Sequence, residues 1–482
     1  MAEINTFFIK EPDLYFANKT RFKDPKGGLY LFGPYGKFEN EEYLMTINAG
    51  IIGTSESINN TIAFFERIGN KILARSKGGI HFPGIGLHKT LKLNIKFSPH
   101  LQGIITNKEI IQCEEIADRS NRARFVLNLI DNYLGSISKK EPFPDLVYVS
   151  IPRKIIELCK KPGQIGDHIT IAHRRFSDKL TEDQIIGDYD FHDIIKVIGM
   201  KHLIPTQVIL PHSLSLRENP RVQFFAQRAW NLTVASYYKA KGIPWKLAEL
   251  DSETCYAGIS FYRQLDEENN QIMRASIAQL FLATGESIVL RGNPFEWSEH
   301  GKQPRLSSEQ TVDLKDKIID AYIKTHKTKP RRLVIHKTSI FQEQEINGFL
   351  EAYDVVEEID LLSMRSSPLD WFRDGTYAIP RGTVIKTPDG AFYIFTLGYI
   401  PQLDTFPKPG FPIPIEVTPF TLDSPEQKMW KEILSLTKLN WNNANFCDQM
   451  PITITAAESV GEILSEARIR DVEIMSEYRY YI

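Results

Sequence analysis

The sequence lacks the features that mark several special classes of protein. Its four cysteines (Cys113, Cys159, Cys255 and Cys447) are far apart, form no CxxC pair and have no histidine at metal-ligand spacing. This pattern argues against a zinc site or a disulfide framework and favours reduced, buried thiols. No run approaches the roughly 20 apolar residues of a membrane span, and the N-terminal MAEINTFFIKEP contains acidic residues and no long apolar core. We therefore expect a cytoplasmic protein without a membrane segment.

Neither sign of charge is in excess, because 58 Lys and Arg residues are balanced by 60 Asp and Glu residues, for a formal net charge of −2. No global basic field marks the chain as a nucleic-acid binder, so any site for a polyanion must be local. The hydrophobic and charged fractions, 42% and 24%, are those of an ordinary globular protein. A chain of 482 residues is long enough for two or more domains.

Strand and helix patterns alternate through the first half of the chain. Residues 46–68, 145–161 and 205–242 each run from an apolar, strand-like stretch into a helical pattern. The segment DPKGGLYLFGPYG, residues 24–36, is rich in Gly and Pro and is typical of turns between short strands. Alternating strands and helices predict a parallel, Rossmann-like α/β domain up to about residue 246.

The pattern changes after Trp245. Three strand-like stretches, CYAGISFYRQL, ASIAQLFLATG and ESIVLRG, follow without long helices between them, as in an antiparallel meander. A helix at 312–326, a buried strand in RRLVIHKT, a further strand, a hairpin at the PDG turn of residues 388–390 and two terminal helices complete the chain. This order predicts an RNase H-like fold. We expect N-terminal strands and the Rossmann-like domain in residues 1–246 and the RNase H-like domain in residues 247–482.

Polar residues converge near one helix-to-strand corner in FHDIIKVIGMKHLIPTQVILP, residues 191–211. His192 and Lys196 lie one helical turn apart and so point the same way, and Gln207 opens the apolar strand that follows the helix. Lys239 is placed to reach the same corner from the next helix. Charge-assisted N–H bonds would suit a phosphate group there. The alternative is a solvated helix face at His192 and Lys196, with Gln207 as a turn residue.

The RNase H-like half has hydroxyl groups where a nuclease of that fold needs carboxylates. Such nucleases hold two metal ions with acidic residues on the first and later strands, because neutral groups cannot balance divalent charge. Here Ser260 lies in the middle of the first strand, and Thr338 follows the later strand in IHKTSIF. These residues argue against nuclease activity, unless the fold assignment is wrong and they are ordinary strand residues.

The C-terminus, YRYYI, is apolar and aromatic. Such termini tend to dock on the protein rather than fray. Docking would bury the α-carboxylate of Ile482, which would then need a cation or hydrogen-bond donors.

Several motifs together are specific enough to identify a family resemblance. They are EPDLYF, DPKGGLYLFGPYG, FHDIIK, IPTQVIL, YYKAKGIPWKL, CYAGISFY, RRLVIHKTSIF, LTKLNWN, PITITAAESVGEIL and YRYYI. Over essentially its whole length the sequence resembles a short prokaryotic Argonaute, which consists of MID and PIWI domains without the N and PAZ domains. The resemblance implies a Rossmann-like MID domain followed by an RNase H-like PIWI domain.

The resemblance implies a role for the polar corner. In Argonaute MID domains a His or Tyr, a Lys, a Gln and a second Lys hold the 5′-phosphate of the guide strand. The matching residues here are His192, Lys196, Gln207 and Lys239. A divalent cation, expected to be Mg²⁺, often bridges that phosphate and the C-terminal carboxylate, which maps to Ile482 with Gln207 nearby.

The same resemblance implies an inactive PIWI domain. Catalytic Argonautes carry an Asp-Glu-Asp-Asp/His tetrad, whose first Asp matches Ser260 and whose second Asp matches Thr338. Two neutral replacements are enough to abolish two-metal hydrolysis, so we expect no cleavage by this chain. The other two positions have no secure counterpart. Their candidates are Glu286 or Glu296 for the Glu, and Glu458 or Thr455 for the last position.

Short, inactive members of the family act with a separate protein. That partner bears an APAZ region fused to an effector, commonly a TIR or sirtuin-like NAD-consuming domain and less often a nuclease. The Argonaute subunit loads a small guide RNA, recognises complementary single-stranded DNA of an invader and activates the effector. The resemblance therefore implies a non-catalytic defence subunit whose partner depletes NAD, with oligomerisation of the heterodimer on activation left open.

Two other functions stay open. One is a guide-directed nuclease with a rearranged metal site built from Glu286, Glu296 or Glu458. The other is a nucleotide-binding enzyme whose first domain serves a small phosphorylated ligand, although neither early strand is followed by a G-x-G-x-x-G or Walker pattern.

Overall fold

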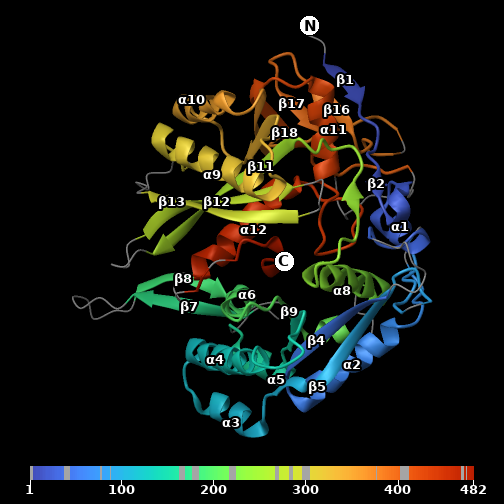
Figure 1. The fold of residues 1–482 in the computed structure, drawn as a ribbon, viewed down its shortest axis with the longest axis vertical. Helices are drawn as coiled ribbons and strands as arrows, with labels where there is room; N and C mark the ends of the chain where they lie inside the picture. The colour runs from blue at the N-terminus through green and yellow to red at the C-terminus, as the bar shows by residue number, and fades with distance from the viewer. Residues whose placement is uncertain are drawn as a thin grey trace.

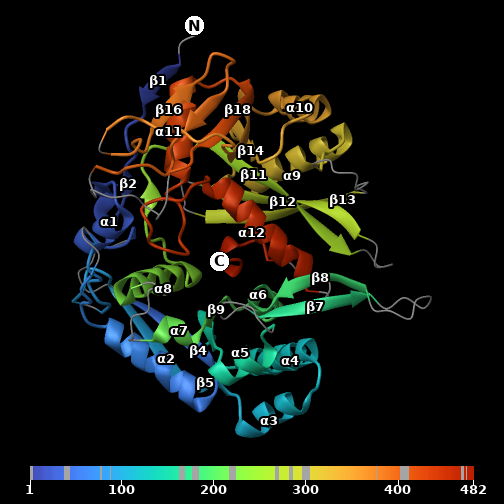
Figure 2. The ribbon, with the colours of Figure 1, turned by 180° about the vertical axis from the view of Figure 1, so that it is seen from behind.

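The computed structural model contains two main β-sheets with helices packed on their faces (Figures 1 and 2). The structure describes residues 4–36, 44–75, 79–86, 88–161, 169–175, 184–215, 224–265, 271–281, 286–295, 304–375, 377–401, 412–467, 472–473 and 475–482. A four-stranded sheet lies in the first half of the chain and a nine-stranded sheet in the second. Helix α12 (Ile452–Ala467) and the C-terminus lie between the two sheets in both views.

The four-stranded sheet is parallel throughout, in the order β5-β4-β6-β9. Its strands are β4 (Met45–Gly53), β5 (Leu93–Ile104), β6 (Leu146–Ser150) and β9 (Thr206–Ile209). The helices that pack on one face are α2 (Ser55–Ile68) and α8 (Phe225–Lys239), and those on the other face are α4 (Arg119–Ile137), α5 (Arg153–Cys159) and α6 (Phe191–Lys201). The predicted Rossmann-like α/β half is therefore confirmed.

Shorter elements connect these layers. They are α3 (Asn107–Glu115), α7 (Pro211–Leu214) and a two-stranded antiparallel ribbon of β7 (Thr170–Arg175) and β8 (Gln184–Asp190). The ribbon leads directly into α6. It thus lies immediately before the helix that carries two of the predicted site residues.

The prediction of turns in residues 24–36 is wrong, because a helix, α1 (Pro25–Leu31), forms there. Asp24 caps the helix by accepting a hydrogen bond from the Gly27 N–H at 2.9 Å, and the proline at the first helical position has no N–H to leave unpaired. A Cβ at Gly28 would lie 2.1 Å from the ring of Phe16. The glycine thus serves close packing of the helix rather than a turn.

The nine-stranded sheet has the order β1-β16-β17-β18-β15-β14-β11-β12-β13. Its strands are β1 (Asn5–Phe8), β11 (Thr254–Leu265), β12 (Gln271–Phe281), β13 (Glu286–Phe295), β14 (Arg332–Lys337), β15 (Glu358–Ser366), β16 (Thr383–Lys386), β17 (Phe392–Ile394) and β18 (Ile415–Leu422). Strands β11, β12 and β13 form an antiparallel meander, and β14 and β15 add to β11 in parallel. This is the strand order predicted for the RNase H-like fold, and the predicted hairpin joins β16 to β17.

Helices cover both faces of the larger sheet. Helices α9 (Ser308–His326) and α10 (Glu343–Leu350) pack on one face, and α12 packs against β11 and β12 on the other. Helix α11 (Glu426–Leu436) precedes α12. The four cysteines are buried and form no disulfide, as predicted. Among the described residues, no helix is both long and apolar enough to cross a membrane.

The backbone passes between the two halves at two places. Strand β1 pairs with β16, so the chain begins in the sheet of the second half. It continues into β2 (Leu14–Tyr15), which pairs with β3 (Arg21–Phe22) and with β10 (Lys246–Leu247) in a small three-stranded sheet. Strand β10 then carries the chain back to the larger sheet. The domain boundary near Trp245 stays a prediction. Strand β1, although it precedes that boundary in the sequence, belongs to the nine-stranded sheet of the second half.

A buried ion network ties the larger sheet to α11. The Arg332 guanidinium of β14 donates to the Asp360 carboxylate at 2.9 Å and to the Glu432 carboxylate at 2.7 Å. Tyr256 donates to the same Glu432 oxygen at 2.6 Å. All three charged side chains are buried, so each carboxylate depends on Arg332 for its counter-charge.

We expect Arg332→Met to lower the free energy of unfolding by about 3–5 kcal/mol, because it leaves two buried carboxylates without their cation. Arg331→Met is the matched control, since the Arg331 side chain is 43% exposed and pairs with glutamates at the surface. Its loss should stay below about 1 kcal/mol. Urea unfolding followed by circular dichroism measures both variants. Equal losses would contradict the structural role of the network.

Candidate functional site

Helix α6 positions two of the predicted site residues. Asp190 caps its start by accepting a hydrogen bond from the His192 N–H at 2.8 Å. The apolar residues around Ile195 pack in the core against the parallel sheet, as predicted. Lys196 is only 9% exposed and lies where α6 meets α12, within the electrostatic influence of Glu462. Lys196 is therefore not part of a solvated helix face.

Strand β9 and helix α8 bring Gln207 and Lys239 together. Lys239 is the last residue of α8 and is 2% exposed. Its ammonium donates to the Thr206 carbonyl oxygen at 2.8 Å and to the Gln207 side-chain oxygen at 2.6 Å. The Gln207 amide nitrogen donates to the Val208 carbonyl at 3.2 Å. Both acceptors of Lys239 are neutral, and an ammonium has a third N–H to donate.

Two ammonium groups share this buried corner. Burial and the nearby Lys196 ammonium lower the pKa of Lys239 well below its ordinary value. Burial also lowers the pKa of Lys196, against the opposing effect of Asp193, whose carboxylate oxygen lies 3.5 Å from the Lys196 nitrogen. A bound anion would raise both pKa values, because it stabilises the charged forms. The corner therefore favours an anionic ligand.

His192 lies at the edge of the same corner. Its side chain is 43% exposed, and its Nδ1 is 3.5 Å from the Asp193 carboxylate. The surrounding protein and the Lys196 ammonium lower the pKa of His192, while Asp193 raises it. The net lowering favours a neutral imidazole at pH 7, with one N–H to donate.

The C-terminal residues dock on this corner, as predicted for the YRYYI terminus. The 3₁₀ turn η4 (Tyr478–Tyr480) contacts both α6 and α8. Arg479 donates to the Lys239 carbonyl oxygen at 3.1 Å, and the Tyr480 hydroxyl donates to the Leu203 carbonyl oxygen at 3.1 Å. Ile482 is 6% exposed. The structure thus gathers His192, Lys196, Gln207, Lys239 and the chain terminus in one region.

The second predicted site lies between the larger sheet and α12. Ser260 is half-buried in β11, on the same face of the strand as Gly258, where a Cβ would meet the Thr453 carbonyl oxygen of α12 at 1.8 Å. On β14, His336 bonds through Nδ1 to the Thr453 hydroxyl at 2.7 Å. Thr338 follows β14 directly and is half-buried. Ser260 and the end of β14 therefore adjoin the start of α12.

The remaining candidates are less well placed or not described. Glu458 is exposed on α12, and the Thr455 hydroxyl is buried without a hydrogen-bond partner. Glu286 begins β13, which β12 separates from β11, and Glu296 lies outside the described residues. Within the ranges given above, no three side chains of His, Cys, Asp and Glu gather closely enough to hold a metal ion.

Two residues of the corner escaped the sequence-based prediction. Asp193 lies three residues before Lys196, one helical turn away, and this spacing could have identified it as a partner. Arg479 gave no such signal, because its bond to the Lys239 carbonyl joins residues 240 positions apart.

No family model and no curated protein matches the sequence. Solved structures match the fold. The Clostridium butyricum Argonaute bound to a guide DNA and a 19-mer target DNA has a TM-score of 0.61 and 15% identity, over 96% of this chain and 53% of that one. Drosophila Piwi has a TM-score of 0.61 and 13% identity, over 98% and 56%. Aquifex aeolicus Argonaute has a TM-score of 0.56 and 15% identity, over 98% and 57%.

The chain thus spans little more than half the length of these proteins. At such low identity the likeness concerns the arrangement of the backbone. It agrees with the Rossmann-like and RNase H-like halves found in the two sheets. The chain therefore has the MID–PIWI-type fold of Argonaute proteins.

Proposed function

We propose that this chain binds the 5′-phosphorylated end of a small guide RNA and uses the guide to recognise complementary single-stranded DNA. The observation that carries the proposal is the pair of buried ammonium groups, Lys196 and Lys239, beside Gln207 and the docked C-terminus. A phosphate at this corner accepts charge-assisted bonds from both lysines. His192 donates its one N–H from the exposed edge of the corner.

A Mg²⁺ ion fits this proposal. Mg²⁺ binds oxygen ligands and usually keeps several waters, often sharing substrate phosphates with one or two carboxylates. The buried terminus would offer the Ile482 carboxylate, and the Gln207 side-chain oxygen, which accepts from Lys239 at 2.6 Å, would be a second oxygen ligand. When bound, the ion supplies the positive charge that allows a phosphate and a carboxylate to lie close together.

We also propose that the chain does not cleave nucleic acid. Ser260 and Thr338 adjoin the start of α12, where the RNase H-like fold would place acidic metal ligands. Hydroxyl groups do not balance the charge of two divalent ions. The activity that follows recognition would then belong to a partner.

The partner that fits best is an APAZ protein fused to an effector, a TIR or sirtuin-like NADase in the first place and a nuclease in the second. This chain spans about half the length of the Argonautes it matches, and an APAZ region would cover the far end of a guide–target duplex. Recognition of an invader's DNA would activate the effector and deplete NAD. The chain would thus be a guide-binding subunit of a prokaryotic defence complex.

Lys196→Ala and Lys239→Ala should each weaken binding of 5′-phosphorylated RNA by about ten- to a hundredfold, because each removes a charge-assisted bond of roughly 1.5–3 kcal/mol. Binding of 5′-hydroxyl RNA should barely change. Lys201→Ala is the matched control, since Lys201 lies on the same helix, is half exposed and pairs with Asp131 at 2.7 Å. Filter binding of both RNAs measures the effect. Equal losses for the two RNAs, on folded variants, would refute the phosphate pocket.

Binding of 5′-phosphorylated RNA should also take up a proton at pH values above the pKa of the free Lys239. The pKa of Lys239 is lowered in the free protein, and a bound phosphate raises it again. The affinity for the RNA is therefore constant at pH values below the Lys239 pKa of the free protein. It falls as the pH rises from that value to the Lys239 pKa of the complex. The slope approaches about tenfold per pH unit for one proton. Titration calorimetry between pH 7 and 10 measures it.

Lys239→Met should flatten this pH dependence, because it removes the titrating group. Lys241→Met, at an exposed lysine just beyond α8, should keep the slope of the unmodified chain. A slope that survives in Lys239→Met would show that another group takes up the proton.

The purified chain, loaded with guide RNA in Mg²⁺ or Mn²⁺, should leave a complementary DNA or RNA strand intact, because Ser260 and Thr338 supply no carboxylate. Gel electrophoresis of an end-labelled target tests this. Cleavage at a guide-determined position that disappears in Glu286→Gln or Glu296→Gln would instead establish a rearranged nuclease site.

A further inference from the structure

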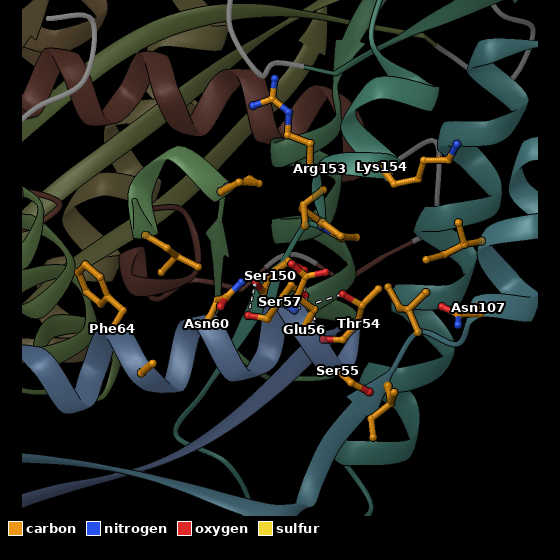
Figure 3. Close-up of a pocket in the computed structure, with 18 of the residues that line it drawn as sticks. Thr54, Ser55, Glu56, Ser57, Asn60, Phe64, Asn107, Ser150, Arg153 and Lys154 are labelled. Atoms are coloured by element: carbon orange, nitrogen blue, oxygen red, sulfur yellow. Dashed lines mark hydrogen bonds between the residues drawn. The ribbon is translucent and has the colours of Figure 1, made fainter. Parts of the chain in front are cut away.

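A cavity of about 1080 Å³ opens at the carboxyl ends of the parallel strands (Figure 3). In the sheet order β5-β4-β6-β9, β5 lies on one side of β4 and β6 on the other. The order in which the chain adds strands therefore reverses between β5 and β6. The helices that follow β4 and β6, α2 and α5, pack on opposite faces of the sheet. Ligands of open α/β sheets bind in the crevice that such a reversal creates. The cavity occupies this crevice, and its volume slightly exceeds the roughly 300–1,000 Å³ that is typical of ligand sites.

The floor of the cavity is fixed by hydrogen bonds between α2 and β6. The Ser57 hydroxyl donates to the Ser150 carbonyl oxygen at 3.1 Å, and the Thr61 hydroxyl donates to the Ser150 hydroxyl at 3.0 Å. A Cβ at Gly53 would lie 2.4 Å from the Ser57 hydroxyl, so glycine is needed where the helix starts this close to β6. The floor is therefore rigid and preformed.

Other polar groups at the floor have no bonding partner in the described part of the chain. Ser55, Asn60 and Asn107 line the cavity and are exposed, with no hydrogen bond from their side chains. Figure 3 shows Asn60 and Glu56 beside Ser57, at the centre of the lining residues. A carboxylate with neighbouring hydroxyl and amide groups is suited to the vicinal hydroxyls of a ribose.

The walls and the rim have a different character. Leu214 contributes apolar surface to the walls, and Phe64 lines them with only 3% of its surface exposed. Arg153 and Lys154 extend outward from the rim in Figure 3, with side chains 71% and 48% exposed, and they pair with Glu157 at 3.1 Å and with Glu114 at 2.8 Å. Helices α2 and α3 both begin at the cavity and add the positive ends of their dipoles. The site thus combines a polar floor, an apolar wall and a rim of ion-paired basic side chains.

We propose that this cavity binds a ribonucleoside monophosphate, separately from the guide 5′-phosphate. The ribose hydroxyls bond to Glu56 and Asn60, and the base lies against Leu214. The phosphate reaches the rim, where it replaces a glutamate as the partner of Arg153 or Lys154. The site differs in position from the polar corner: β9 begins at the corner, with Gln207 its second residue, and ends at the cavity, where Pro211 lines the wall. The inference does not rest on guide binding.

The test is calorimetric titration of the full chain with AMP in the Lys239→Ala background, which weakens any binding of AMP to the polar corner. AMP should bind at one site, and 2′-deoxy-AMP and adenosine should each bind about tenfold more weakly, since each lacks one bonded group. Inorganic phosphate alone should not bind measurably. Lys196→Ala provides a second background and should give the same result.

A pair of neighbouring asparagines on α2 supplies the matched control. Asn60→Trp places an indole ring where the ribose is proposed to bind and should abolish AMP binding, whereas Asn59→Trp, at an exposed residue of the same helix outside the cavity, should preserve it. Thermal melting confirms that both variants fold. The proposal fails if AMP shows no saturable binding up to about 1 mM, a weak limit for a specific site. It also fails if both tryptophan variants bind alike, or if phosphate binds as tightly as AMP.

Discussion

The polar corner depends on the packing of the chain's last residues against α6 and α8. Arg479 and Tyr480 bond to the backbone carbonyls of Lys239 and Leu203 and so hold the 3₁₀ turn against α6 and α8. An ammonium group taken out of water costs several kcal/mol unless a counter-charge is present. Because Lys239 has only neutral acceptors, part of that cost stays unrelieved in the free protein. An anion that binds there would stabilise the folded chain as well as the contact between its halves.

Where the described side chains of β11 and β14 meet the start of α12, the contacting groups are neutral. Burial and the charge of Arg332 lower the pKa of His336 to about 3, so the imidazole that bonds to Thr453 is uncharged at physiological pH. A neutral hydrogen bond of this kind tolerates burial without a metal ion nearby. Buried charged groups of this half have protein counter-charges, as in the Arg332 network and in the Lys337–Glu345 pair.

The sequence predicted the elements whose patterns are local and missed those that depend on distant contacts. Alternating apolar stretches identified β4, β6, β9 and the helices after them, because each buries one face against the same sheet. The glycines of α1 misled the prediction, since their role is to let Phe16 approach the helix, and the chain position of Phe16 gives no sign of that. At the polar corner, helical spacing singled out His192 and Lys196, and the start of the following strand singled out Gln207. Arg479 became visible only when the fold brought the terminus to α8.

The cavity illustrates the same limit. No glycine-rich phosphate motif precedes α2, and this absence argued against a small phosphorylated ligand in the first half. The crevice arises from the order of the strands, and strand order is a property of the whole sheet.

The two passages of the backbone between the halves lie side by side, because β2 and β10 are hydrogen-bonded to each other. Two halves of a chain that are joined by two adjacent, hydrogen-bonded segments can rotate about one axis, but they resist twisting or sliding against each other. The two sheets would therefore separate by rotation about a hinge at β2 and β10. The polar corner, between α6, α8 and the chain terminus, would lie in the interface that this rotation opens.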